Sequence, residues 1–292
     1  MNIKKIILPI LIIAVLAISL SACVQDKYLS KDAQELGKLI SAKGDSSLGL
    51  IDKSKLDAET KLLYKVYAAF GDDKLPKEYA SSTMFRSSNE VMYEVRTKYK
   101  TFSKKTQEKL APFLKRPEEE GSYFNLRYGG KTVSQSPSGL IPTAHAIRPN
   151  TSIYTEFLVS ADGKAKIWYP NVDTNSGAIF GAGNVAVNAA SAKKMAEKVK
   201  KYLDNDKIIS KFKTLMGRDL MSDGTKGGDS KLDIYIAPTG EDLAITYAEN
   251  GTPTASHILL NTTLSNDTVL KTTLAHEIFH SFQYVYKYDT TR

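Results

Sequence analysis

Three residues near the C-terminal end of the sequence have the types and the spacing of a zinc site. His276 and His280 are four residues apart, and Glu277 follows the first histidine. On an α-helix, residues four apart lie on one face about one turn apart, so two imidazoles there can bind a single cation. Zinc binds imidazole nitrogen and lowers the pKa of a water molecule in its open position, and a neighbouring carboxylate can accept that water's proton. The pentad, residues 276–280, therefore predicts two metal ligands, His276 and His280, and a general base, Glu277.

The pentad needs a helix with an apolar side to hold it against the protein. Apolar residues recur at three- and four-residue spacing through this segment, at Leu270, Leu274, Ile278, Phe282 and Val285. This period is typical of an amphipathic helix, and Asn266 or Asp267 can cap its start. The alternative is a helix that carries two surface histidines without a metal. Chance placement of the pentad is uncommon in a chain with four histidines, which favours the metal site.

The N-terminal residues have the pattern of an export signal. Lys4 and Lys5 precede an apolar run from Ile6 to about Leu20, and small residues lead to Cys23. The sequence Leu20-Ser-Ala-Cys23 resembles the bacterial lipobox, which implies cleavage before Cys23 and acylation of its thiol. The alternative is an ordinary secretory signal followed by a stray cysteine. We expect an extracytoplasmic protein anchored to the bacterial cell membrane by a lipidated Cys23, and no disulfide, because the chain has no other cysteine.

The charge of the chain is basic but spread along it. The formal net charge is +8, and removal of Lys4 and Lys5 with the signal leaves about +6. The densest run of lysines, at 193–201, has the spacing of a solvated helix face, and no aromatic residues or nucleic-acid motifs accompany it. We therefore expect no nucleic-acid partner, and adhesion to anionic lipid headgroups is the better use for this charge.

The pattern divides the chain into two parts after the signal. From Tyr28 to about Glu120 the apolar spacing is helical, and it predicts helices at 31–42, 57–70, 88–99 and 103–114. Beyond the charged, proline-containing segment at 116–121, the spacing becomes strand-like. We predict a signal peptide at 1–22, a helical N-terminal region at 23–121 and a second domain at 122–292. The helical region is either a pro-region or collar around the catalytic part, or a packing domain or membrane spacer.

The second domain alternates between strand and helix patterns. Strands are predicted at 122–128, 153–159, 164–169, 232–237 and 257–261, and helices at 189–203 and 208–216. The turn Ser160-Ala-Asp-Gly163 predicts a hairpin between two of the strands. The last strand directly precedes the pentad helix, so we expect its sheet edge to be able to pair with an extended peptide. The predicted fold class is α+β, with a small mixed sheet.

A Gly/Asp-rich segment before the 232–237 strand offers a possible calcium site. Asp223, Asp229 and Asp233 could converge on one ion, because hard cations favour clustered carboxylates. Their spacing does not fit an EF-hand loop. The alternative is a Gly/Asp turn that leads into the strand.

The segments Leu232-Asp-Ile-Tyr-Ile236, Ser256-His-Ile-Leu-Leu-Asn261 and Thr273–Gln283 together resemble secreted or lipid-anchored bacterial metallopeptidases of the zincin class, on its gluzincin side. This resemblance implies a zincin-like domain and peptide or protein substrates. It assigns His276 and His280 as zinc ligands and Glu277 as the base, and it implies a third ligand, a glutamate on a later helix.

The third ligand is where the sequence departs from that family. No glutamate follows His280, Asp289 is the one carboxylate after it, and 281–288 contains neither glycine nor histidine. We expect either a copy truncated at its C-terminus and inactive as given, or an unusual third ligand such as His257; His145 is a weaker candidate.

The sequence as a whole predicts a membrane-anchored, extracytoplasmic zinc peptidase that hydrolyses peptide bonds with metal-activated water. The alternative is a non-catalytic surface lipoprotein that keeps the pentad helix as scaffold.

Overall fold

The structure is a computed structural model that describes residues 46–81, 88–128, 152–171, 189–240, 242–249 and 253–286. These residues form eight α-helices and one mixed sheet of five strands, which is compatible with the predicted α+β class. They belong to one compact unit. No helix among them is long and apolar enough to span a bilayer. Cys23, His145, Asp289 and the helix predicted at 31–42 lie outside the described residues.

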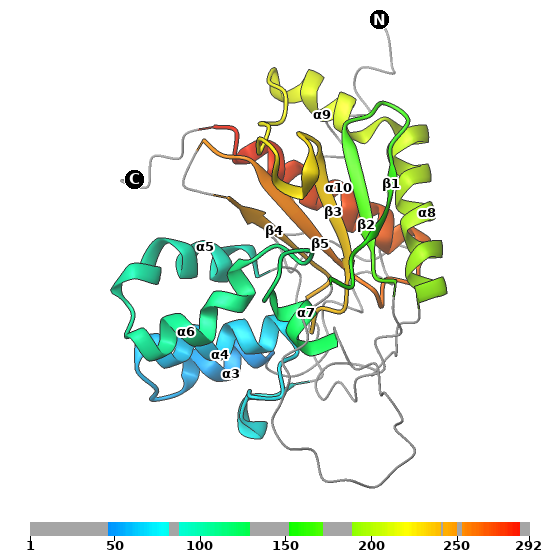
Figure 1. Cartoon of the computed structure of the whole chain (residues 1–292). Coiled ribbons are helices and arrows are strands. Elements are labelled where there is room, and N and C mark those ends of the chain that lie inside the picture. The colour runs from blue at the N-terminus through cyan, green and yellow to red at the C-terminus, as the bar shows by residue number, and fades with distance from the viewer. Residues whose placement is uncertain are drawn as a thin grey trace, which may run out of the picture. The chain divides into compact units, whose positions relative to one another are not determined.

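Four of the five strands of the sheet are completely buried, and only β1 has exposed residues. Its strands are β1 (Glu156–Val159), β2 (Ala165–Tyr169), β3 (Leu232–Ala237), β4 (Ala244–Ala248) and β5 (Ser256–Asn261), in the spatial order β1-β2-β3-β5-β4. The three middle strands, β2, β3 and β5, are parallel to one another. At the two edges, β1 pairs antiparallel with β2, and β4 pairs antiparallel with β5 (Figure 1). Apolar runs such as Ile258-Leu-Leu260 are typical of strands that are covered on both faces.

The sequence predicts three parts of this sheet correctly and one part wrongly. The β1–β2 hairpin and the strands β3 and β5 are confirmed. The expectation that the strand before the pentad helix forms a sheet edge is wrong, because β5 lies between β3 and β4. The edge strand next to β5 is β4, which the sequence pattern does not predict. Its residues, Ala-Ile-Thr-Tyr-Ala, are all buried, so they lack the polar alternation of an exposed edge.

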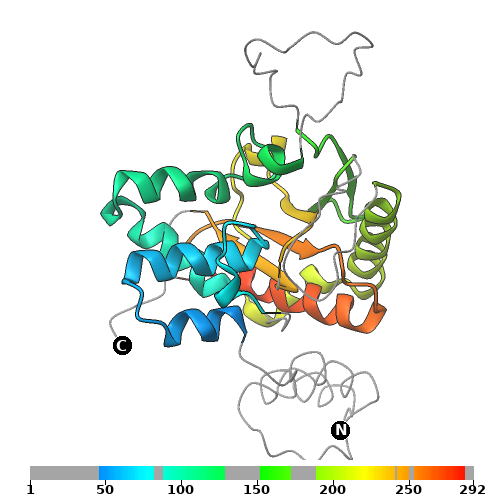
Figure 2. The ribbon, with the colours of Figure 1, turned by 90° about the horizontal axis from the view of Figure 1, so that it is seen from below.

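Helices from the first part of the chain cover one face of the sheet. They are α3 (Ser47–Lys53), α4 (Ala58–Phe70), α5 (Asn89–Lys98), α6 (Lys104–Leu114) and α7 (Tyr123–Tyr128). Helix α4 begins after Asp57, whose side chain accepts a hydrogen bond from the Thr60 N–H at 2.9 Å, and it ends at Gly71 in the left-handed conformation, with φ of 60°. Seen from below, α3–α6 lie on the side of the sheet away from α8 (Figure 2). The predicted ranges of α4, α5 and α6 are confirmed to within about one residue.

The strand predicted at 122–128 is wrong, because this segment forms helix α7. Ser122 starts the helix: its Oγ accepts from the Asn125 N–H at 3.3 Å and its carbonyl accepts from the Leu126 N–H at 2.9 Å. Tyr123 and Phe124, which are neighbours in the sequence, are both buried. A strand would send them to opposite faces, whereas one turn of helix lets both join the same aromatic cluster.

The other face of the sheet carries the remaining helices, α8 (Ala189–Asp206), α9 (Ile208–Met216) and α10 (Asp267–Gln283). Helix α8 packs on β1 and β2, and α10 packs on β4 and β5 and also contacts α8 and α9. In Figure 1, α10 crosses behind the strands and α8 runs beside β1 and β2. The predicted ranges of α8 and α9 are confirmed at their starts, and α8 is three residues longer than expected at its end.

The first helices and the sheet share one hydrophobic core. Phe70, Phe113 and Tyr123 pack in the same cluster as Tyr235 and Tyr247 of the sheet. The loop after β3 joins the two parts directly, because the Gly240 N–H donates to the Ala69 carbonyl at 2.8 Å. Both sides of the boundary predicted near residue 121 therefore contribute to this core, and the predicted domain division stays a prediction.

Candidate metal centre

The helix that carries the pentad begins and packs as the sequence predicts. Asn266 is its N-cap, and the Asn266 side chain accepts hydrogen bonds from the Thr268 and Val269 N–H groups at 2.9 and 3.0 Å. The apolar side is completely buried at Leu270, Leu274, Ile278 and Phe282. This burial fixes the rotation of α10 and therefore the direction in which the pentad side chains point.

The two histidines of the pentad meet on one side of α10. Their Nε2 atoms are 3.0 Å apart, and their ring planes are nearly perpendicular at 89°, with centroids 4.5 Å apart. Two imidazole ligands of a tetrahedral zinc, each about 2.0–2.1 Å from the metal, have nitrogens about 3.3 Å apart. The observed separation is close to this value, so the pair can bind one zinc ion with little rearrangement.

Gln283, one turn further along α10, holds the ring of His280. Gln283 Oε1 lies 2.7 Å from His280 Nδ1. Burial lowers the pKa of His280, while the hydrogen bond to Gln283 and the charge of Glu90 oppose this shift. His280 is therefore favoured in its neutral form, which is the form that binds a metal.

Glu277, which follows His276 in the sequence, is completely buried. Its Oε2 accepts hydrogen bonds from Thr246 Oγ1 at 2.5 Å and from Asn89 Nδ2 at 3.3 Å. Its Oε1 is buried and has no hydrogen-bond partner among the described residues. Burial raises the pKa of Glu277 to about 7, against the two hydrogen bonds.

The two imidazoles and the buried carboxylate have the chemistry that a zinc site and a general base require. A buried carboxylate oxygen without a donor is the acceptor that a reacting water requires, and the neighbouring histidines offer two imidazole nitrogens. Among the residues that the structure describes, no group of three or more histidine, cysteine, aspartate or glutamate side chains converges for a metal. The described part of the chain thus brings two imidazoles together and adds no third group of these types to them.

The edge strand beside the pentad is covered by helix α5. The Thr246 N–H, on the outer side of β4, donates to Asn89 Oδ1 at 2.6 Å, and Arg96 Nη1 donates to the Glu249 carbonyl at 2.7 Å. Asn89 therefore contacts both the edge strand and the Glu277 carboxylate. Asn89 and Thr246 are not recognisable as site residues from the sequence, because an asparagine at a helix start and a threonine in a strand have ordinary structural roles.

His257, the alternative third ligand, is not brought to the pentad. It is buried, with 1% of its surface exposed, and its Nδ1 lies 2.7 Å from Glu249 Oε1. Its ring stacks on Tyr247 at 4.8 Å. Thr246 contacts Glu277, so its side chain points to the face of the sheet that α10 covers. Successive side chains of a strand point to opposite faces, so Tyr247 and the His257 ring stacked on it lie on the other face.

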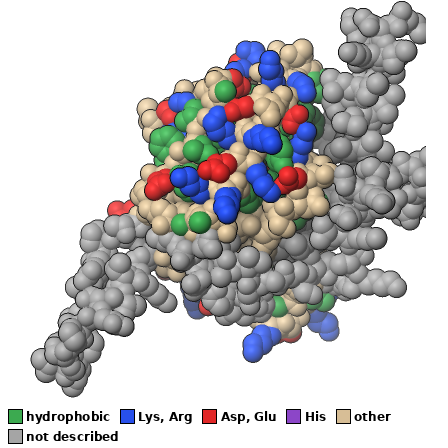
Figure 3. Space-filling view, turned by 90° about the vertical axis from the view of Figure 1, so that its right-hand side faces the viewer, with side chains coloured by type: hydrophobic (Ala, Val, Ile, Leu, Met, Phe, Trp, Pro, Cys, Tyr) green, Lys and Arg blue, Asp and Glu red, His purple; other side chains and the backbone are tan. Residues whose placement is uncertain are grey.

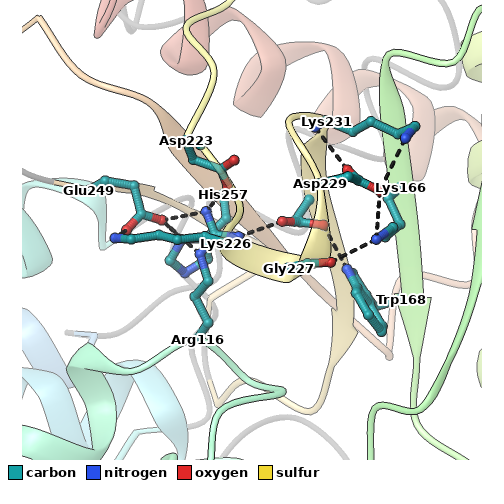
Figure 4. Close-up of polar contacts among 12 residues, drawn as sticks. Arg116, Lys166, Trp168, Asp223, Lys226, Gly227, Asp229, Lys231, Glu249 and His257 are labelled. Atoms are coloured by element: carbon teal, nitrogen blue, oxygen red, sulfur yellow. Dashed lines mark hydrogen bonds and ion pairs between the residues drawn. The ribbon is translucent and has the colours of Figure 1, made fainter.

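Two of the three aspartates considered for calcium converge on an arginine. Arg116, 2% exposed, pairs with both Asp223 and Asp233, and its Nη2 lies 2.8 Å from Glu249 Oε1 (Figure 4). Asp229 lies apart and pairs with Lys166 and Lys231 at 2.8 and 3.0 Å. The Arg116 guanidinium thus occupies the position in which a cation between these carboxylates would sit.

Lysines of α8 pair with carboxylates of α8 and of α10. Lys198 pairs with Asp267 at 2.6 Å, and Lys200 pairs with Asp204 at 2.5 Å. On this side of the molecule, basic and acidic side chains are interspersed (Figure 3). The face is therefore less strongly basic than its lysine content suggests.

Comparison with profiles of protein families, with curated proteins and with solved structures gave no match. The resemblance of the pentad segment to zincins therefore depends on the residues quoted above.

Proposed function

We propose that this protein is a zinc-dependent peptidase of the zincin class, exported and anchored to the membrane through an acylated Cys23. The observations that carry the proposal both lie on α10: two imidazole Nε2 atoms are 3.0 Å apart, and the carboxylate of Glu277, the residue after His276, has a buried oxygen without a hydrogen-bond partner among the described residues. Imidazole pairs at this spacing suit zinc, and a free carboxylate oxygen suits general base catalysis.

Each side chain has a defined task in this reaction. His276 and His280 hold the metal, which when bound polarises the peptide carbonyl and lowers the pKa of water. Glu277 accepts the proton of the attacking water at Oε1 and later donates it to the leaving amine. Thr246 and Asn89 hold the other oxygen, Oε2, through hydrogen bonds of 2.5 and 3.3 Å. These two hydrogen bonds to Oε2 fix the orientation of the carboxylate and leave Oε1 for the water.

The test separates metal binding from catalysis in the full-length protein. We expect His276→Ala and His280→Ala to lose bound zinc, measured by elemental analysis after dialysis. Glu277→Gln should retain zinc, because the carboxylate does not bind the metal, but should lose chelator-sensitive cleavage of a mixed peptide library read by mass spectrometry. Lys271→Ala is a matched control on the exposed side of α10, where Lys271 pairs with Asp206 at 2.8 Å. Equal zinc loss in all four variants would contradict these roles.

The anchor has its own test. Replacement of Cys23 by alanine removes the thiol that acylation requires, so we expect the variant to leave the membrane fraction or to remain as an uncleaved precursor. A normally processed Cys23→Ala protein that stays in the membrane fraction would disprove the lipid anchor.

A second candidate function is a non-catalytic surface lipoprotein in which α10 is a structural element. The complete burial of Glu277 and its hydrogen bonds to β4 and α5 favour it, because a buried glutamate can serve as a structural link. In that case wild-type protein retains no zinc after dialysis and cleaves no member of the library.

A further inference from the structure

We propose that Gln283 is a positioning residue that fixes the tautomer of His280, so that Nε2 is the nitrogen presented to the metal. This inference rests on the proposed function and deepens it. The observation behind it is the 2.7 Å contact between Gln283 Oε1 and His280 Nδ1.

The chemistry of the two groups decides which nitrogen carries the proton. An amide oxygen can only accept a hydrogen bond, so His280 Nδ1 must donate and carry the proton. In the neutral ring, Nε2 then has the lone pair. Metal-binding histidines are usually held in this way, by an acceptor on the nitrogen that does not bind the metal.

Helix geometry makes this contact local. Gln283 is three residues after His280 on α10, so the two side chains lie on the same side of the helix. Tyr284, which follows, still donates its N–H to the His280 carbonyl at 3.0 Å, so the last turn that carries Gln283 is closed. The acceptor is thus supplied by the same helix as the ligand.

The contact between the two histidines follows from this assignment. His280 Nε2 carries a lone pair and lies 3.0 Å from His276 Nε2, so in the metal-free protein His276 Nε2 donates the proton of that hydrogen bond. To bind a metal at both Nε2 atoms, His276 must move or lose this proton, whereas His280 needs no change. His280 is therefore the ligand that is ready before the metal arrives.

Three proteins test the inference. Gln283→Met keeps the length of the side chain but removes the acceptor, and Gln283→Glu keeps an acceptor. Gln107→Met is the matched control, because Gln107 donates to the Phe102 carbonyl at 2.7 Å far along the chain from α10. The first readout is the tautomer of His280 in metal-free protein, from long-range ¹H–¹⁵N correlation spectra with ¹⁵N-labelled histidine. The chain has four histidines, so single His→Gln variants assign the signals.

The second readout is zinc affinity, measured by competition with a chromogenic chelator. We expect Gln283→Met to populate the Nε2–H tautomer of His280 and to weaken zinc binding about 10- to 100-fold, as for other residues that orient metal ligands. Gln283→Glu should keep the Nδ1–H tautomer and bind zinc at least as tightly as wild type, and Gln107→Met should match wild type in both readouts.

The outcomes distinguish this inference from the proposed function. An unchanged tautomer and unchanged zinc affinity in Gln283→Met would overturn the role of Gln283 while leaving the zinc site intact. If wild-type protein binds no zinc, the proposed function fails, and the spectra of metal-free protein still decide whether Gln283 sets the tautomer.

Discussion

The side-chain amide of Asn89 donates a hydrogen bond to the carboxylate of Glu277 at 3.3 Å, which joins helix α5 in the first part of the chain to the pentad on α10. The same amide accepts from the Thr246 N–H at 2.6 Å. The Asn89 side chain therefore forms hydrogen bonds both with the edge strand β4 and with the candidate base Glu277. This contact brings helix α5, from the first part of the chain, to the candidate base.

Asn89→Asp tests this contact selectively. The variant keeps an oxygen for the Thr246 N–H but replaces the donor that faces Glu277 with a second acceptor. We expect the free energy of unfolding, measured in urea at pH 8, to fall by about 1–3 kcal/mol, because a buried carboxylate loses one of its two donors. Glu90→Gln, at the next and exposed position, should change it by less than about 0.5 kcal/mol. Equal stability of Asn89→Asp and wild type would contradict the contact.

Gly240→Ala tests whether the first helices and the sheet unfold together. A Cβ atom at Gly240 would lie 2.3 Å from the Gly71 nitrogen and 2.4 Å from the Ala68 oxygen, both of them backbone atoms that cannot turn aside. We expect a loss of about 1–3 kcal/mol or more, as for other overpacked sites. The measurement is urea unfolding followed by Trp168 fluorescence, which reports the sheet, and by far-ultraviolet circular dichroism, which reports mostly the helices.

The control for this variant is Gly163→Ala, where no atom lies within 4 Å of the added Cβ and only the positive φ of 70° resists the change. We expect Gly240→Ala to lower the midpoints of both signals together. A variant in which helices and sheet unfold separately would show that residues 46–128 form a domain of their own.

The sequence predicts elements with clear periodicity, and it fails where tertiary contacts decide. Helix α10 follows from its apolar spacing and its Asn266 cap, and both are confirmed. Helix α7 does not, because Tyr123 and Phe124 are placed by an aromatic cluster with Phe70 that no local pattern shows. Strand β4 is missed because burial on both faces removes its polar alternation.

In the candidate site, too, the sequence predicts the local features and misses the contacts between distant segments. The pentad is visible in the sequence because its three side chains are local to one helix. The partners of Glu277 are not, because Asn89 is 188 positions away and Thr246 is 31 positions away. Contacts over such separations depend on the packing of α5, β4 and α10, and single-sequence periodicity contains no information about them.

Arg116→Met tests the buried ion cluster. The guanidinium pairs with Asp223, Asp233 and Glu249 while only 2% of the arginine is exposed. Its removal leaves buried carboxylates without their main cation, so we expect a loss of about 3–5 kcal/mol in urea unfolding at pH 8.

The matched control is Lys226→Met. Lys226 also pairs with Glu249, at 2.5 Å, but its side chain is 42% exposed. Water screens such a pair, so the expected loss is below about 1 kcal/mol. Similar losses in the two variants would show that burial does not strengthen the Arg116 pairs.

His257 gives the fold a dependence on pH whose sign can be worked out. Burial lowers the pKa of His257 to about 4, although the neighbouring Glu249 opposes the shift. The imidazole is therefore neutral in the folded protein between pH 4 and pH 6.5, where the unfolded chain binds a proton. A lowered folded-state pKa means that the contribution to stability is present above pH 6.5 and is lost as the pH falls through 4.

His257→Asn removes this titration while keeping an amide that can donate to Glu249. We expect the stability advantage of wild type over the variant to shrink by about 3 kcal/mol between pH 7 and pH 4, from the 2.5-unit difference between the two states. Asp233 contributes in the opposite sense, because burial raises its pKa to about 7 against the Trp168 hydrogen bond and Arg116. Asp233 is present in both proteins, so the difference between them isolates His257. A difference in unfolding free energy that stays constant from pH 7 to pH 4 would show that His257 is not held neutral by burial.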